Sequence, residues 1–147
     1  MSLLDQNGAI EIKLYYKYDS VGPSKRLVIL KEEVAKKQIS DEVEGGAAFP
    51  IEILETKWDL LTWKEQNDVM SLSSQVINPQ TGEKQFNFIA YRDAIVKRCL
   101  KSWNITVKDQ PVPVTPESID ALPGSVVINL YQQFETFIDY TEPESKN

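Results

Sequence analysis

The segment AIEIKLYYKY, residues 9–18, alternates between two kinds of side chain along its whole length. One face carries Ile10, Ile12, Leu14, Tyr16 and Tyr18. The other face carries Glu11, Lys13, Tyr15 and Lys17. A period of two over this length predicts a half-buried β-strand. Tyr15 is the large ring on the polar face, and an exposed ring there would make this strand a surface for a partner.

The residues around this strand predict a small antiparallel sheet. Residues 19–24 are turn formers, and residues 26–32 would return as the second arm of a hairpin. Residues 31–44 fit either a short helix or more strand, and the lysines there favour an extended edge. Residues 41–46 are polar and end in two glycines, which predicts a loop, and a strand resumes over residues 49–55.

The period changes after Trp58. Thr62-Trp63-Lys64-Glu65 fits a capping box and predicts a helix over residues 63–74. Residues 78–83 predict a turn, with room for short strands on either side. A second helix begins near Asn87 and has one apolar face, made of Phe88, Tyr91, Ile95, Val96, Cys99, Leu100 and Trp103.

Proline punctuates the remainder of the chain. Residues 111–114 predict an extended link, and Thr115-Pro116-Glu117 predicts the start of a short helix to Leu122. Pro123 would start the last helix, whose apolar face holds Val127, Leu130, Tyr131, Phe134, Phe137 and Ile138. Residues 141–147 have no apolar anchor and predict a disordered tail.

These patterns together predict an α+β protein. A small antiparallel N-terminal sheet in residues 1–56 would be followed by a helical C-terminal half in residues 57–140. At 147 residues the chain is long enough for one self-sufficient core, so we expect the two parts to form one compact unit.

Composition excludes most enzyme classes. The chain has no histidine, so it lacks an imidazole base and the commonest nitrogen ligand for transition metals. With 22 acidic against 16 basic residues the formal charge is -6, which argues against nucleic acid as the main partner. The N-terminus has no secretory signal pattern, and no apolar run is long enough to span a membrane. We therefore expect a cytosolic protein that uses no histidine-based catalysis and no cofactor or metal.

Few residues are candidates for chemistry. Cys99 is the single cysteine, and its place on an apolar helix face predicts a buried, unreactive thiol. The carboxylates Asp41, Glu42 and Glu44, and the pair Asp59 and Glu65, lack the spacing of a calcium loop and fit solvated surface. The tryptophans Trp58, Trp63 and Trp103 fall at helix boundaries, where each would close the core or meet a partner.

Two segments resemble a known family. Leu61-Thr62-Trp63-Lys64-Glu65-Gln66-Asn67, followed after a loop by a helix ending Arg98-Cys99-Leu100-Lys101-Ser102-Trp103, resembles the tail assembly chaperones of tailed bacteriophages. The run from Pro111 to Pro123 is similar to the proline-rich link that leads into the final helix of that family. The resemblance covers about residues 58–138 and includes no catalytic signature, so it implies a protein without enzymatic activity.

The resemblance implies a function and a location. Members of this family bind the long, aggregation-prone tape measure protein and recruit tail tube subunits around it, in the host cytoplasm and without entering the virion. The expected contacts are non-covalent and made by exposed aromatics and helix faces. The candidate partner-binding residues are Trp63, Trp103, Tyr131 and Phe134.

Two further possibilities follow from the same resemblance. The chain could instead be a structural virion protein of the tail or baseplate, which would share the composition and small size. The family often makes a longer product by ribosomal slippage near the end of the first reading frame. Ser145-Lys146-Asn147 is compatible with the slippery run A-AAA-AAC if the codons are TCA-AAA-AAC, so we predict a frameshifted longer form as a possible further partner.

Overall fold

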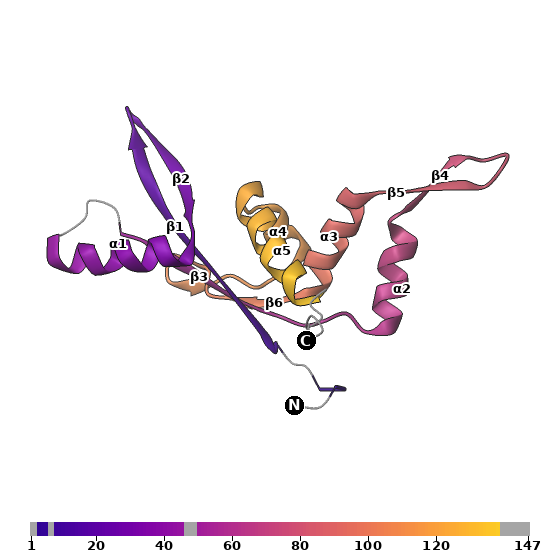
Figure 1. The fold of residues 1–147 in the computed structure, drawn as a ribbon, viewed down its shortest axis with the longest axis horizontal. Helices are drawn as coiled ribbons and strands as arrows, with labels where there is room; N and C mark the ends of the chain where they lie inside the picture. The colour runs from indigo at the N-terminus through magenta and orange to yellow at the C-terminus, as the bar shows by residue number, and fades with distance from the viewer. Residues whose placement is uncertain (1–2, 6–7, 46–49, 139–147) are drawn as a thin grey trace, which may run out of the picture.

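The computed structural model describes residues 3–5, 8–45 and 50–138, with the backbone alone at residues 41–45. Its centre is a four-stranded antiparallel sheet (Figure 1). The strands are β1 (Ile10–Val21), β2 (Ser24–Leu30), β3 (Glu52–Trp58) and β6 (Leu100–Trp103), in the order β2-β1-β3-β6. The predicted strand at residues 9–18 is therefore an inner strand of this sheet.

The α+β class is confirmed, but the predicted division into a sheet half and a helical half is wrong. Strands and helices alternate along the chain, and the fourth strand of the main sheet comes from residues 100–103. Two further hairpins lie in the second half. They are β4 (Ser74–Asn78) with β5 (Glu83–Phe86), and β7 (Thr106–Val107) with β8 (Gln110–Pro111).

Helix α1 (Glu32–Gly45) corrects the extended edge expected at residues 31–44 and the loop expected at 41–46. Glu32 and Glu33 stand in its first turn, where the helix dipole favours negative charge. Lys36 Nζ lies 2.9 Å from Glu32 Oε1, one turn away. No glycine or proline interrupts residues 31–44, so nothing in the backbone opposes the helix.

Tyr15 is buried, so the condition under which the first strand would present it to a partner is not met. Helix α1 contacts β1 and carries a fully buried residue, Ala35. Lys17, on the same strand face as Tyr15, donates from Nζ to Gln38 Oε1 of α1 at 3.3 Å. Around Tyr15 and Lys17, this face of β1 is therefore covered by a helix that the sequence pattern did not resolve, while Glu11 and Lys13 on the same face stay exposed.

The helices of the second half are α2 (Trp63–Leu72), α3 (Phe88–Cys99), α4 (Pro116–Asp120) and α5 (Gly124–Ile138). The caps predicted at Thr62 and Thr115 are confirmed, and Asn87, where a helix start was predicted, is a third cap; each side chain accepts from a backbone N–H of its first turn. Helix α3 ends at Cys99, earlier than expected, because residues 100–103 pair with β3. Part of the predicted extended link at 111–114 belongs to the β7–β8 hairpin, whose turn residues Lys108 and Asp109 both have positive φ.

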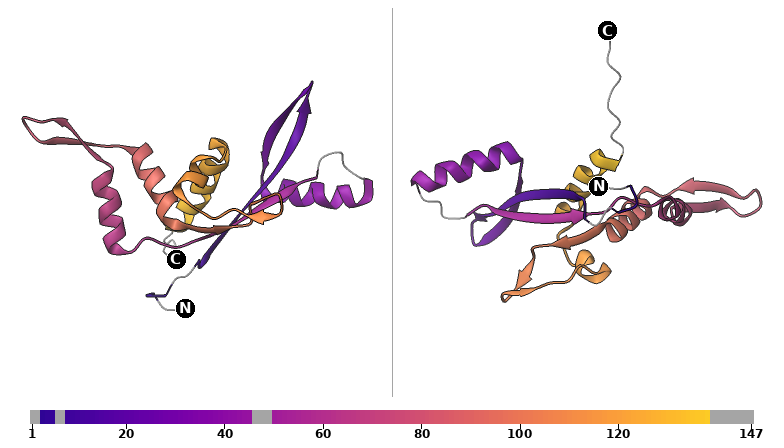
Figure 2. Two further views of the ribbon diagram at one scale, coloured as in Figure 1. Left: turned by 180° about the vertical axis from the view of Figure 1, so that it is seen from behind. Right: turned by 90° about the horizontal axis from the view of Figure 1, so that it is seen from below.

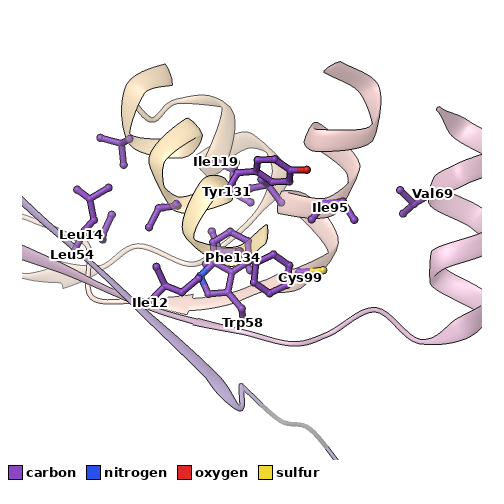
Figure 3. Close-up of a cluster of buried hydrophobic side chains, with 14 residues drawn as sticks. Ile12, Leu14, Leu54, Trp58, Val69, Ile95, Cys99, Ile119, Tyr131 and Phe134 are labelled. Carbon is purple, nitrogen blue, oxygen red and sulfur yellow. The ribbon is translucent and has the colours of Figure 1, made fainter. Parts of the chain in front are cut away.

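The core lies between the sheet and helices α3, α4 and α5 (Figure 3). The Trp58 ring of β3 stacks on the Phe134 ring of α5, with centroids 4.6 Å apart. Trp58 Nε1 donates to Thr56 Oγ1 at 2.7 Å, and Thr56 Oγ1 donates to the Ile12 carbonyl at 2.7 Å. All three residues are buried, so this relay satisfies polar groups that would otherwise be left without partners in the core.

Helices α4 and α5 stand near the middle of the molecule, while two β-hairpins point outward on opposite sides of them (Figures 1 and 2). One is the β1–β2 hairpin and the other is the β4–β5 hairpin, which follows α2. The predicted tail at residues 141–147 lies outside the described residues.

Replacing Thr56 tests the buried relay. We expect Thr56→Val to lower the free energy of unfolding by about 1–3 kcal/mol, because the Trp58 N–H and the Ile12 carbonyl lose their partner inside the core. Thr56→Ser keeps the hydroxyl and should recover most of that loss. Urea unfolding followed by tryptophan fluorescence measures both variants. Equal stability of the valine and serine variants would show that the hydroxyl is not needed.

Candidate protein-binding surface

Helix α2 and the β4–β5 hairpin form an arm that leaves the central sheet (Figure 1). We use "arm" for residues 63–86. The arm contacts the rest of the molecule through packing of α2 on α3, with Val69 fully buried. Its hairpin pairs only with itself and is not a strand of the main sheet.

Hydrogen bonds fix both ends of α2. At its start, Thr62 Oγ1 accepts from the Glu65 N–H at 3.2 Å and Glu65 Oε1 accepts from the Thr62 N–H at 3.1 Å. The bond from the Thr62 backbone holds the pKa of Glu65 below its usual range. At its end, the buried Ser73 hydroxyl donates to the Val69 carbonyl, and the Asn87 N–H donates to the Ser73 carbonyl at 2.7 Å. The base of the hairpin is thereby attached to α3.

The hairpin is shaped by its turn residues and by a bulge. Asn78 Oδ1 accepts from the Gln80 N–H at 3.0 Å, and the Asn78 carbonyl accepts from the Gly82 N–H at 2.9 Å. Gly82 has a φ of 73°, which glycine adopts without strain. The strand register shifts between Val76 and Asn78, so Ile77 is an extra residue without a cross-strand partner.

The arm and the first turn of α3 expose most of the large apolar side chains of this region. We call this set the arm surface: Trp63, Met70, Leu72, Val76, Ile77, Phe86, Phe88 and Ile89. Trp63 is 80% exposed and Ile89 is 70% exposed. Isolated two-stranded hairpins are at best marginally stable in water, so a hairpin that also exposes Val76 and Phe86 is suited to being covered by another protein.

Side chains of the arm surface are aligned with one another. Trp63 and Met70, seven residues apart on α2, lie on one helix face. Val76 and Phe86 share one face of the hairpin, because Ser74 pairs with Phe86 and Val76 pairs with Lys84. The Phe86 ring lies 5.3 Å from the Tyr91 ring, which joins the hairpin face to α3.

The predicted partner-binding residues divide into three environments. Trp63 is exposed on the arm. Trp103 is half-buried on β6, where its Nε1 donates to the Val112 carbonyl at 2.6 Å. Tyr131 and Phe134 are 2% and 0% exposed, so their predicted place on a partner-facing surface is wrong. Both point from α5 into the core, and Phe134 stacks on Trp58 (Figure 3).

Sequence reasoning missed most of the arm surface. It treated Phe88 as core and assigned no role to Leu72, Val76, Ile77, Phe86 and Ile89, five exposed apolar side chains in 18 consecutive residues. The available signal was that Val76, Ile77 and Phe86 flank a predicted turn, and a short hairpin around that turn cannot bury them by itself. Recognising this required knowing that the hairpin stays apart from the main sheet.

Other candidates for chemistry have structural roles. The Gly8 N–H donates to the Asp59 carboxylate, and Glu65 belongs to the cap of α2. Among residues 3–5, 8–45 and 50–138, no group of three potential metal ligands comes together. The side chains of Asp41, Glu42 and Glu44 lie outside the described residues.

The basic end of α3 is also engaged. Lys97 Nζ lies 3.1 Å from Asp93 Oδ1 and 2.9 Å from Asp120 Oδ1, and these bonds raise the pKa of Lys97. Arg92 stands over the Phe88 ring, 5.5 Å from its centroid. These contacts connect α3 to α4 and give the basic residues a role within the fold.

Comparison of the chain with protein-family models, curated proteins and solved structures returned no match. None of the helices in the described part of the chain has the length and apolar character needed to cross a lipid bilayer.

Cys99 should be inert in the folded protein. Burial raises the pKa of its thiol to about 12, and the side chain is 1% exposed. We expect a disulfide-exchange reagent at pH 8 to leave the native protein unmodified over hours and to modify one thiol per chain in urea. Labelling of the native protein within minutes, under conditions where it stays folded, would contradict the buried position.

The capping box makes the stability of α2 pH-dependent. The pKa of Glu65 is lowered in the folded state. The stabilisation that its carboxylate provides is therefore complete above the usual pKa range of glutamate and is lost as the pH falls through the pKa of the folded state. We expect Glu65→Ala to lower the free energy of unfolding by about 0.5–1 kcal/mol at pH 7 and by less at pH 3, as measured by urea unfolding at the two pH values. Asp68→Ala, at an exposed position on the same helix, is the control and should cost little at either pH.

Proposed function

We propose that this protein is a bacteriophage tail assembly chaperone that binds the tape measure protein through the arm surface. The observation that carries the proposal is the arm itself, which holds exposed apolar side chains away from a core that is complete without them. The proposal also relies on the resemblance of residues 58–138 to that family. No catalytic step is part of it.

The arm surface suits an apolar helical partner. Trp63 and Met70 on α2 provide one apolar strip, and Val76 and Phe86 on the hairpin provide another. An amphipathic helix binds by placing an apolar face against such strips, and large rings contribute most of the energy of a contact of this kind. Covering the hairpin would also stabilise it, since water otherwise competes for its backbone bonds.

The remaining surface supports solubility of the complex. The chain carries a formal charge of -6, which opposes non-specific aggregation of a chaperone loaded with an aggregation-prone client. We propose that the client is held in the host cytoplasm by non-covalent contacts until tail tube subunits assemble around it. Recruitment of those subunits, and a role for a frameshifted longer form, belong to the same proposal.

Matched variants test the arm as the client-binding surface. Val76 and Val107 are 55% and 60% exposed, and each lies on a two-stranded hairpin. We expect co-expression with the tape measure protein of the source phage to keep that protein soluble. Val76→Ser should lower the soluble fraction, Val76→Ser combined with Trp63→Ala should lower it at least threefold, and Val107→Ser should leave it unchanged.

Three results would contradict this assignment. They are a tape measure protein that is equally insoluble with and without this chain, equal effects of the Val76 and Val107 variants, and a loss explained by unfolding of the arm variant in circular dichroism. Mass spectrometry of purified particles addresses the alternative. If this chain is present in the particles at a fixed copy number, it is a structural tail or baseplate protein.

A further inference from the structure

The N-terminal half of β1 has one unpaired edge. Strand β2 pairs with residues Tyr15–Val21 of β1, and β3 pairs with residues Ile10–Tyr16 on the other side. Within the described chain, residues 10–14 therefore have β3 on one side and no strand on the other. In an antiparallel strand, alternate residues direct their N–H and C=O groups to opposite sides, so this edge offers backbone groups to an additional strand.

A groove of about 760 Å³ runs along this edge. One wall is formed by residues 29–33, where β2 ends and α1 begins. The other wall is a stripe of α5 consisting of Asn129, Gln133 and Phe137, spaced four residues apart. Phe137 is 52% exposed and is the large apolar side chain of that stripe. The groove thus has polar and apolar walls and a strand edge along its floor.

The open edge is complementary to itself. Its five residues read Ile10-Glu11-Ile12-Lys13-Leu14, with Ile12 at the centre. When two copies pair antiparallel about Ile12, Glu11 lies opposite Lys13 of the other copy, twice over. On the apolar face of the strand, Ile10 lies opposite Leu14 of the other copy. Charges therefore meet opposite charges, and apolar side chains meet apolar side chains.

The charges within each chain continue this pattern. Glu11 is opposite Lys57 of β3, and Lys13 is opposite Glu55. Across the four neighbouring strands of a dimer, the charged residues would follow in the order Lys57 and Glu11 of one copy, then Lys13 and Glu55 of the other copy. Glu11 and Lys13 would then each have an opposite charge on both neighbouring strands.

The limits of the open edge match the length of this pairing. Before Ile10 the chain turns at Gly8, whose φ is 64° and whose N–H donates to Asp59. After Leu14 the edge is occupied by β2, starting with the Tyr15–Leu30 pair. A pairing centred on Ile12 uses residues 10–14 of both copies and stops where each edge is closed.

We propose that a second copy of this chain pairs with β1 along residues 10–14, forming a two-fold symmetric dimer with one continuous antiparallel sheet. Self-complementarity is the requirement of a two-fold interface, and the edge meets it in backbone direction, charge and apolar pattern. Phe137 of each copy borders the groove and would be covered there. This proposal does not depend on the client or on the arm, which is a different part of the molecule.

Charge reversal tests the pairing on the full chain. Sedimentation velocity across a concentration series should show a monomer–dimer equilibrium for the natural protein. Glu11→Lys puts lysine opposite Lys13, and Lys13→Glu puts glutamate opposite Glu11, so each variant alone should raise the dimer Kd about tenfold or more. A mixture of the two variants restores both opposite-charge pairs and should form heterodimers, measured by native mass spectrometry.

The mixture separates pairing from general effects of the substitutions. Each variant keeps its own contacts within the chain when mixed, so recovery can come only from the contact between copies. Lys25→Glu, near the outer end of the β1–β2 hairpin, makes the same charge change as Lys13→Glu away from the open edge and is the matched control. A natural protein that stays monomeric at 200 μM, or variants whose association is unchanged or not recovered on mixing, would overturn the proposal.

Discussion

The stacking of Trp58 on Phe134 is the contact on which the rest of the fold depends. It joins β3 to α5 through two residues that lie 76 positions apart in the sequence, and both rings are fully buried. The Trp58 N–H is satisfied through Thr56, which also binds the Ile12 carbonyl of β1. One cluster therefore fixes two strands and one helix together, and losing any member leaves a cavity or an unsatisfied polar group.

Because that core is complete, the remaining apolar side chains are free for another use. The arm contributes Val69 to the core but leaves Trp63, Val76 and Phe86 exposed. An arm of this kind buries few apolar side chains and gains little stability from them. We therefore expect it to unfold locally more readily than the sheet. This division between a stable centre and a weakly supported arm connects the fold to the proposed binding of a client.

Local signals in the sequence predicted the caps at Thr62 and Thr115, the helix start near Asn87 and the strand at residues 9–18, since each depends on neighbours within a few positions. Features set by distant pairing were not predictable in this way. Residues 100–103 look like a continuation of α3 until β3 is present to pair with them. Tyr131 and Phe134 look like any exposed or buried helix face until Trp58 is placed against them, and the arm surface emerged only once its hairpin was seen apart from the main sheet.

Hydrogen–deuterium exchange with and without the tape measure protein measures the proposed role of the arm most directly. In the free protein, amides of β4 and β5 should exchange much faster than those of β1 and β3. Adding the client should protect residues 63–89 and leave the sheet unchanged. Protection confined to the main sheet, or none at all with a client that is shown to bind, would contradict binding through the arm.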